Sequence, residues 1–191
     1  ITGRSKASSA AIELLGVVAL ESSYHLTPQA SATNSSRCAK PLKFPTLFFI
    51  VSFSTPNCFA TAIAAAQLGA RVHALDTDPI AVEVAKENLE LNGVADVVRV
   101  EHGTLGAPPS IAIPRHTGDN YDLLLVNILA EVIIGMAAAI AAALRAGGRW
   151  AASGIIEEKA PDVIRALEGA GLVVDEQLNE DGWVALIGHK P

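Results

Sequence analysis

Residues 61–93 constrain the fold more strongly than any other part of the sequence. An Ala-rich helical pattern ends at Gly69, a short apolar segment covers residues 71–75, and a second helical pattern runs from D-T-D-P to Asn92-Gly93. Glycine adopts the left-handed conformation that often ends a helix, and proline fits the first helical turn because its missing N–H is not needed there. This order predicts a helix–strand–helix unit of an α/β nucleotide-binding sheet.

The same alternation of strands and helices continues toward the end of the sequence. Half of the residues are hydrophobic but only 5% are aromatic, which is typical of helices packed on a parallel sheet. We predict a doubly wound, mostly parallel sheet in which residues 172–176 and 183–187, connected through residues 179–182, form a C-terminal antiparallel hairpin. The helix over 79–91 is expected to bury Ile80, Val84 and Leu91. Gly147-Gly148 is expected to end a helix that starts near residue 131, and residues 149–152 to form the next strand.

The first 58 residues follow no such pattern. Residues 12–19 fit a helix, and residues 44–53 fit an edge or central strand. Between them, residues 21–43 are rich in Ser, Thr, Pro and Asn, and a structureless run of this length is unusual in a compact domain. We therefore predict an irregular N-terminal segment, 1–58, with an aberrant insertion at about 18–58, followed by one α/β domain over 59–191.

Charge and cysteine content argue against several classes of function. The net charge is −6 and no basic run occurs, so neither nucleic acid nor an anionic membrane is an expected partner. Cys38 and Cys58 are far apart, and no CxxC or HExxH pattern occurs, so no metal site is predicted. The apolar run 44–53 has about half the length that spans a bilayer. A cytoplasmic protein is therefore the expectation.

Three polar residues lie where doubly wound sheets bind ligands, beyond the carboxyl ends of the strands. Asp76 follows the strand over 71–75 and can accept both hydroxyl hydrogens of a ribose, although Asp76 or Asp78 can instead cap the next helix. Asn127 follows the strand over 121–126, and its carboxamide either faces the reactive end of a cofactor or caps the following helix. Thr104 either contacts an adenine or is an ordinary turn residue.

Several motifs together resemble a known enzyme family. The runs A-I-A-A-A-Q-L-G-A, A-L-D-T-D-P-I-A-V, D-L-L-L-V-N-I-L-A and S-G-I-I-E-E follow one another over about residues 60–190. They resemble the Rossmann-like class I S-adenosylmethionine-dependent methyltransferases, and more narrowly the PrmA family, which methylates a large-subunit ribosomal protein (protein eleven). The resemblance implies that Asp76 binds the ribose of S-adenosylmethionine, that Asn127 lies near its methionine end and the methyl acceptor, and that Thr104 lies near the adenine. The opening T-G-R-S-K-A-S-S is similar to the family's T-G-x-H-x-T-T, which implies that Ser8 contacts the cofactor.

The sequence departs from this family just before residue 59. The family carries D-x-G-x-G-x-G there, whereas this chain reads S-F-S-T-P-N-C and has no glycine between residues 17 and 68. Three explanations remain open: a foreign insertion, a divergent working loop, or a scaffold that has lost methyl transfer. The prediction is N-methylation of a ribosomal protein, impaired in this chain, with an inactive scaffold or binding module as the alternative and no catalytic residue assigned. A nicotinamide-dependent oxidoreductase would need G-x-G-x-x-G before residue 59.

Overall fold

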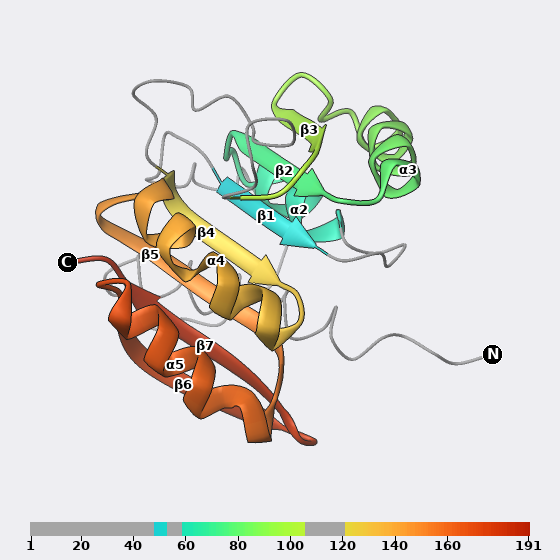
Figure 1. The fold of residues 1–191 in the computed structure, drawn as a ribbon. Coiled ribbons are helices and arrows are strands. Elements are labelled where there is room, and N and C mark those ends of the chain that lie inside the picture. Colours follow the sequence, from blue (N-terminus) through green and yellow to red (C-terminus); the bar gives the residue numbers. More distant parts are fainter. Residues whose placement is uncertain (1–47, 53–58, 106–120) are drawn as a thin grey trace, which may run out of the picture.

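The computed structural model describes residues 48–52, 59–105 and 121–191, which form an α/β unit (Figure 1). The strands and helices, in chain order, are β1 (Phe48–Ser52), α2 (Ala60–Gln67), β2 (Val72–Asp76), α3 (Pro79–Leu91), β3 (Val98–His102), β4 (Tyr121–Asn127), α4 (Ala130–Ala143), β5 (Leu144–Ile156), the 3₁₀ helix η1 (Glu157–Lys159), α5 (Ala160–Gly169), β6 (Val173–Glu180) and β7 (Trp183–His189). The alternation expected from the sequence is therefore confirmed.

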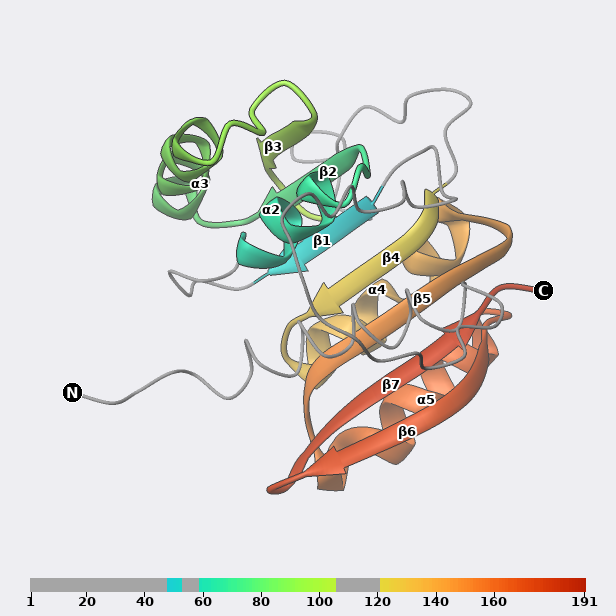
Figure 2. The same ribbon diagram turned by 180° about the vertical axis from the view of Figure 1, so that it is seen from behind.

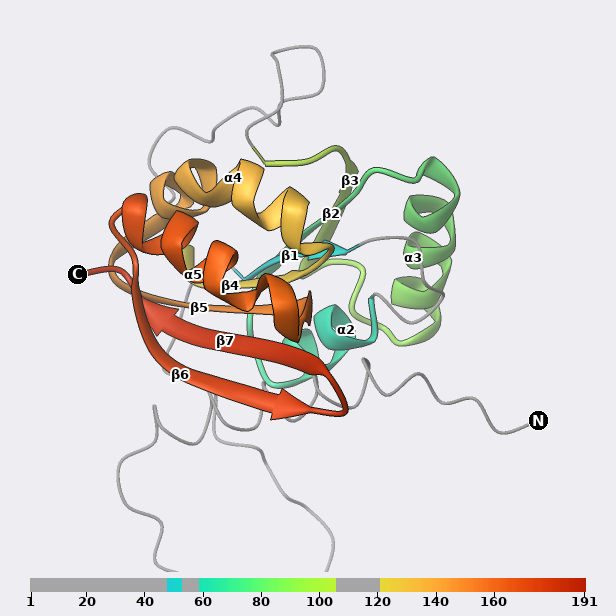
Figure 3. The same cartoon turned by 60° about the horizontal axis from the view of Figure 1, so that its bottom comes forward.

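All seven described strands belong to one sheet, in the order β3-β2-β1-β4-β5-β7-β6. The pairs from β3 to β5 are parallel, and β7 runs antiparallel to both β5 and β6. Helices α4 and α5 cover one face (Figure 1), and α2 lies on the opposite face (Figures 2 and 3). The predicted doubly wound, mostly parallel sheet with a C-terminal antiparallel hairpin is confirmed.

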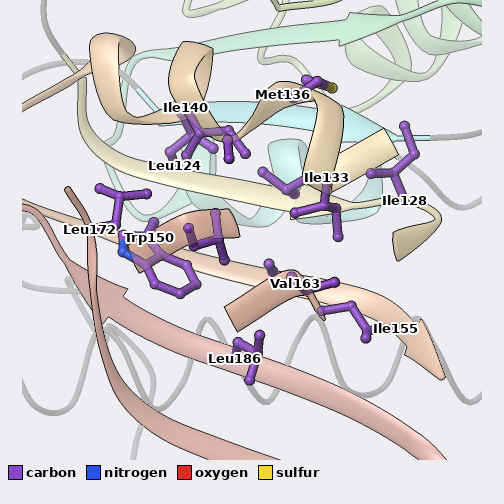
Figure 4. Close-up of a cluster of buried hydrophobic side chains, with 14 of the residues drawn as sticks. Leu124, Ile128, Ile133, Met136, Ile140, Trp150, Ile155, Val163, Leu172 and Leu186 are labelled. Carbon is purple, nitrogen blue, oxygen red and sulfur yellow. The ribbon is translucent and has the colours of Figure 1, made fainter. Parts of the chain in front are cut away.

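Two apolar clusters, one on each face of the sheet, hold these layers together. The cluster under α4 and α5 centres on Trp150, whose side chain is almost fully buried (Figure 4). The other cluster joins α2 and α3 to β2 and β3 through small residues, mainly alanine and valine. Few aromatic side chains are buried, and alanine, valine, leucine and isoleucine make up most of the core.

Strand β1 occupies a central position although it lies within the N-terminal segment predicted to be irregular. Its residue Ser52 pairs with Asp76 of β2 on one side and with Asn127 of β4 on the other. Residues 44–53 were expected to form an edge or a central strand, and residues 48–52 form a central one. The remainder of segment 18–58 lies outside the described residues, so the insertion stays a prediction.

Helix α3 shows one error of the sequence interpretation. Ile80, Val84 and Leu91 were expected to face the core, yet they are 69%, 41% and 83% exposed. The helix instead buries the opposite face, which carries Val82, Ala85 and Leu89. Side-chain size does not distinguish the two faces, since each carries a valine and a leucine, so contacts with the rest of the apolar cluster decide which face is buried.

The end of α4 was also predicted wrongly. The helix ends at Ala143 and β5 begins at the next residue, so Gly147-Gly148 lies within the strand. There Gly147 N–H donates to the Lys190 carbonyl, and Lys190 N–H donates to the Gly148 carbonyl. The Lys190 ammonium also donates to the carbonyls of Ala141 and Leu144, which places a positive charge at the negative end of the helix dipole. No helix within the described ranges is long and apolar enough to cross a membrane.

The C-terminal hairpin has a shorter turn than the sequence indicated. Residues 179–182 were expected to connect the two strands, but only Asp181 and Gly182 separate β6 from β7. Both have positive φ angles, 51° and 81°. Two-residue hairpin turns favour Asp-Gly because their twist matches that of the flanking strands.

Candidate functional site

The carboxyl ends of the parallel strands bring the predicted site residues to one edge of the sheet. The arrowheads of β1, β2 and β4 point toward the same edge (Figure 1). From β1 the chain continues to β2 on one side of β1, and it later returns to β4 on the other side. The strand order therefore reverses at β1, and sheets of this kind bind ligands beyond the carboxyl end of the strand where the order reverses. Asp76 and Asn127 both pair with Ser52 there. Since neighbouring strands lie about 4.8 Å apart, the backbones of these two residues are roughly 10 Å apart.

The sequence left open whether Asp76 or Asp78 caps the next helix, and the structure assigns the cap to Asp78. Asp78 caps α3 by accepting a hydrogen bond from Ile80 N–H at 2.9 Å. Asp76 Oδ1 accepts a hydrogen bond from Asp78 N–H at 2.9 Å, and the side chain is fully buried. The capping requirement of α3 is therefore met without Asp76, which leaves ligand binding as an available role for its carboxylate.

Asn127 does not cap α4, because the residue preceding that helix is Leu129 and no side chain caps it. Its carboxamide instead contacts the end of β5, where Ser153 Oγ donates to Asn127 Oδ1 at 3.1 Å. The next residue, Gly154, has a φ of +81°, and a Cβ there would lie 3.2 Å from Asn127 Oδ1. The capping alternative for Asn127 is therefore wrong, and the side chain is half-buried at the ligand-binding edge.

Thr104 lies at the same edge, two residues beyond β3. Its hydroxyl contacts the sulfur of Met136 on α4 at 3.7 Å, which links the end of β3 to the helix on that face. Just before it, Gly103 N–H donates to the Asp76 carbonyl at 2.9 Å. The structure therefore places Thr104 near the end of β2, as the adenine hypothesis requires, and the contact with that base stays a prediction.

Two parts of the predicted site cannot be placed. Ser8 and residues 53–58, which complete the S-F-S-T-P-N-C run after Ser52, lie outside the described residues. In contrast, Ser153 and Gly154 belong to the described edge and were not named as site residues from the sequence. They directly follow residues 149–152, which were expected to form a strand, so the rule that selected Asp76 and Asn127 would also have selected them.

A partly buried polar network lies on β2, β3 and β4 before the ligand-binding edge. His73 Nε2 lies 2.7 Å from Glu101 Oε2, and His73 Nδ1 lies 2.8 Å from the Tyr121 hydroxyl. A carboxylate only accepts, so Nε2 donates to Glu101, and the Tyr121 hydroxyl can donate to Nδ1 when the ring is neutral. Burial raises the pKa of Glu101, but hydrogen bonds and charge from Arg99 and His73 lower it more, so its pKa lies below the ordinary value of 4.5.

This network predicts a defined pH dependence of stability. Because the folded-state pKa of Glu101 is lowered, its ionised form stabilises the fold fully above pH 4.5, and this contribution is lost as the pH falls through the lowered value. The difference in unfolding free energy between the parent and Glu101→Gln should therefore be largest near neutral pH and shrink below pH 4.5. Urea unfolding at several pH values measures it. A difference for Glu101→Gln that stays constant across this pH range would refute the assignment.

Sequence comparisons connect most of the described chain to one family. The family model for ribosomal protein L11 methyltransferase (PrmA) matches residues 60–191. The ribosomal protein L11 methyltransferase of Pelotomaculum thermopropionicum is 50% identical over 126 residues, covering 65% of this chain and 38% of that protein. The corresponding protein of Chloroflexus aurantiacus is 42% identical over 147 residues, covering 68% and 45%. The chain thus spans less than half the length of these curated relatives.

Solved structures agree with the sequence comparisons. A ribosomal protein L11 methylase from Lactobacillus delbrueckii subsp. bulgaricus matches with a TM-score of 0.65 at 25% identity, covering 78% of this chain and 73% of that one. An RNA methyltransferase from Salinibacter ruber, solved with S-adenosyl-L-homocysteine, has a TM-score of 0.56 at 18% identity, covering 76% and 81%, and it supports the fold alone. The resemblance noted in the sequence is confirmed. The chain belongs to the ribosomal protein L11 methyltransferase (PrmA) family.

Proposed function

We propose that this chain forms the cofactor-binding and methyl-transferring part of an enzyme that transfers a methyl group from S-adenosylmethionine to an amine of ribosomal protein L11. The observation that carries the proposal is the placement of Asp76 and Asn127 on the two sides of the β1 end, at the switch point of the sheet. Family membership over residues 60–191 supports the reaction and the acceptor.

The residues at this edge fit the chemical groups of S-adenosylmethionine. The buried carboxylate of Asp76 offers acceptor oxygens for ribose hydroxyls in a place shielded from water, where hydrogen bonds are stronger. Thr104, near the end of β2, would contact the adenine. Because Asp76 has no exposed surface, a ribose can bind it only after the residues around it move aside. A binding titration tests whether they do.

Asn127 has the chemistry to hold the methyl acceptor. When bound, S-adenosylmethionine supplies a methyl group on a positively charged sulfur. An uncharged acceptor amine must direct its lone pair at that methyl carbon, and the carbonyl oxygen of Asn127 can accept one of the amine N–H groups to orient it. Transfer would form a bond from nitrogen to the methyl carbon as the carbon–sulfur bond breaks, and the methylated ammonium would then lose a proton to water. Positioning of the amine is thus the main contribution of these side chains.

Acceptor and location follow from the same proposal. The curated relatives carry the name of ribosomal protein L11 methyltransferase, and a ribosomal protein acceptor implies a cytoplasmic enzyme. Direct contact with nucleic acid is not part of the proposal, in agreement with the net charge of −6. Ser8 is proposed as a further cofactor contact on the basis of the T-G-R-S-K-A-S-S resemblance alone.

The decisive experiment incubates the purified chain with S-adenosylmethionine labelled in its methyl group and with ribosomal protein L11 of Chloroflexus aurantiacus. Label in L11 that disappears when L11 is pre-methylated would support the proposal. Binding of S-adenosylmethionine in calorimetry without any transfer would favour the alternative of a methyltransferase-like binding module. If millimolar S-adenosylmethionine produces neither binding heat nor transfer, the enzyme proposal is wrong.

A further inference from the structure

We propose that Ser153 is a positioning residue that fixes the carboxamide of Asn127 for the methyl acceptor. The inference rests on the proposed function, in which Asn127 orients the acceptor amine. Ser153 does not itself touch cofactor or acceptor in this proposal. It acts through the hydrogen bond that its hydroxyl donates to Asn127 Oδ1 at 3.1 Å.

The ends of β4 and β5 are tied together around this hydrogen bond. Asn127 and Ser153 are direct partners in the parallel register of the two strands. One residue further, Ile128 N–H donates to the Ser153 carbonyl at 3.1 Å, so the pairing continues past the end of β4. The backbone that carries Asn127 is therefore held by the same residue whose hydroxyl contacts its side chain.

Because Gly154 has no side chain, it leaves room for the Asn127 carboxamide and for the backbone of Ile128. A Cβ at this position would lie 2.7 Å from the Ile128 carbonyl oxygen, 3.1 Å from Ile128 N and 3.2 Å from Asn127 Oδ1. Its φ of +81° is also a conformation that side chains with a Cβ rarely adopt. Ser153 thus holds the Asn127 carboxamide with a hydrogen bond, and the absence of a side chain at Gly154 leaves the space that this carboxamide occupies.

The hydrogen bond has a chemical consequence for the acceptor. A carboxamide oxygen has two lone pairs, and Ser153 uses one of them, so the second remains available to an amine N–H. Without the hydroxyl, the carboxamide can rotate about its terminal torsion, which has a broad energy profile, and it would spend less time in the orientation that serves the amine. Transfer should then slow, while the ribose-binding carboxylate of Asp76, on the other side of β1, stays unchanged.

Ser153→Ala and Ser153→Thr test this role. For Ser153→Ala we expect a kcat about 10-fold lower, the size of one lost hydrogen bond. The KM for L11 of Chloroflexus aurantiacus and the Kd for S-adenosylmethionine should stay within about twofold of the parent, and Ser153→Thr, which keeps the hydroxyl, should restore kcat. If the parent transfers methyl groups and Ser153→Ala has the same kcat, or if Ser153→Thr does not restore it, the inference is wrong while the proposed function stands.

A second measurement does not depend on activity. The side-chain NH₂ signal of Asn127, assigned by its loss in Asn127→Asp, reports the order of the carboxamide in solution. We expect an order parameter close to that of rigid backbone, about 0.85, in the parent and below about 0.6 in Ser153→Ala. If the parent neither binds S-adenosylmethionine nor transfers its methyl group, the proposed function fails. The order parameter still tests whether Ser153 fixes the Asn127 carboxamide. An unchanged order parameter in Ser153→Ala would overturn the positioning role.

Discussion

Replacing Gly188 with alanine is expected to destabilise the protein by about 3 kcal/mol or more, the upper end of the usual cost of overpacking a core. Gly188 lies in β7, where a Cβ would be 1.9 Å from the Val173 carbonyl oxygen and 2.4 Å from Cζ2 of Trp150. The indole is almost fully buried, and the carbonyl belongs to the neighbouring strand β6, so neither can move aside cheaply. Urea unfolding monitored by circular dichroism measures the change.

Gly135→Ala is the matched control for this prediction. Gly135 lies on the exposed side of α4, and a Cβ there meets no atom within 4 Å. Since alanine has a higher helix propensity than glycine, this variant should gain about 0.5 to 1 kcal/mol. Equal effects of the two substitutions, or a Gly188→Ala variant as stable as the parent, would contradict the packing described for β7.

Replacing Asp76 with alanine should weaken binding of S-adenosylmethionine at least about 100-fold. Hydrogen bonds to a charged group contribute about 1.5–3 kcal/mol each, so losing two of them costs about 3 kcal/mol or more. Calorimetric titration of the parent and the variant measures the change directly. Because Asp76 also accepts a hydrogen bond from Asp78 N–H, thermal unfolding must be followed in parallel to separate lost binding from lost structure.

Two further variants make this prediction specific. Asp76→Asn keeps the shape of the side chain and an oxygen for Asp78 N–H but loses the charge, so binding about 10-fold weaker than in the parent is expected. Asp96→Ala makes the same change as Asp76→Ala at an exposed site before β3, at the opposite end of the strands, and should bind like the parent. Unchanged affinity in a folded Asp76→Ala variant would remove Asp76 from the site.

Local chemistry made several elements predictable from the sequence. Gly69 has the positive φ expected of a residue that ends a helix, and Asp78 caps α3 with Pro79 at the first helical position. The hairpin was predicted because Asp-Gly favours a turn of this kind, although the turn contains only Asp181 and Gly182 of the four residues expected to connect the strands. The rule that ligands bind beyond the carboxyl ends of parallel strands selected Asp76 and Asn127 from the sequence, and the structure places them on either side of β1.

The features that depend on partners far away in the sequence were missed. The buried face of α3 is set by its contacts with the rest of the apolar cluster, and the apolar residues Ile80 and Leu91 on the opposite face do not reveal those contacts. The start of β5 depends on Lys190, more than forty residues later, which pairs with Gly147 and Gly148. For the same reason, the contact between Ser153 and Asn127 became visible only when β4 and β5 were paired.

The position of β7 has a consequence for folding during synthesis. This strand leaves the ribosome after β5 and β6 but lies between them, hydrogen-bonded to both. Until residues 183–189 are available, β5 and β6 each have an unpaired edge, and the indole of Trp150 lacks the strand against which it packs. Exposed strand edges favour pairing with other chains. Translation that stops before Trp183 should therefore release a chain that aggregates, however complete the ligand-binding edge already is.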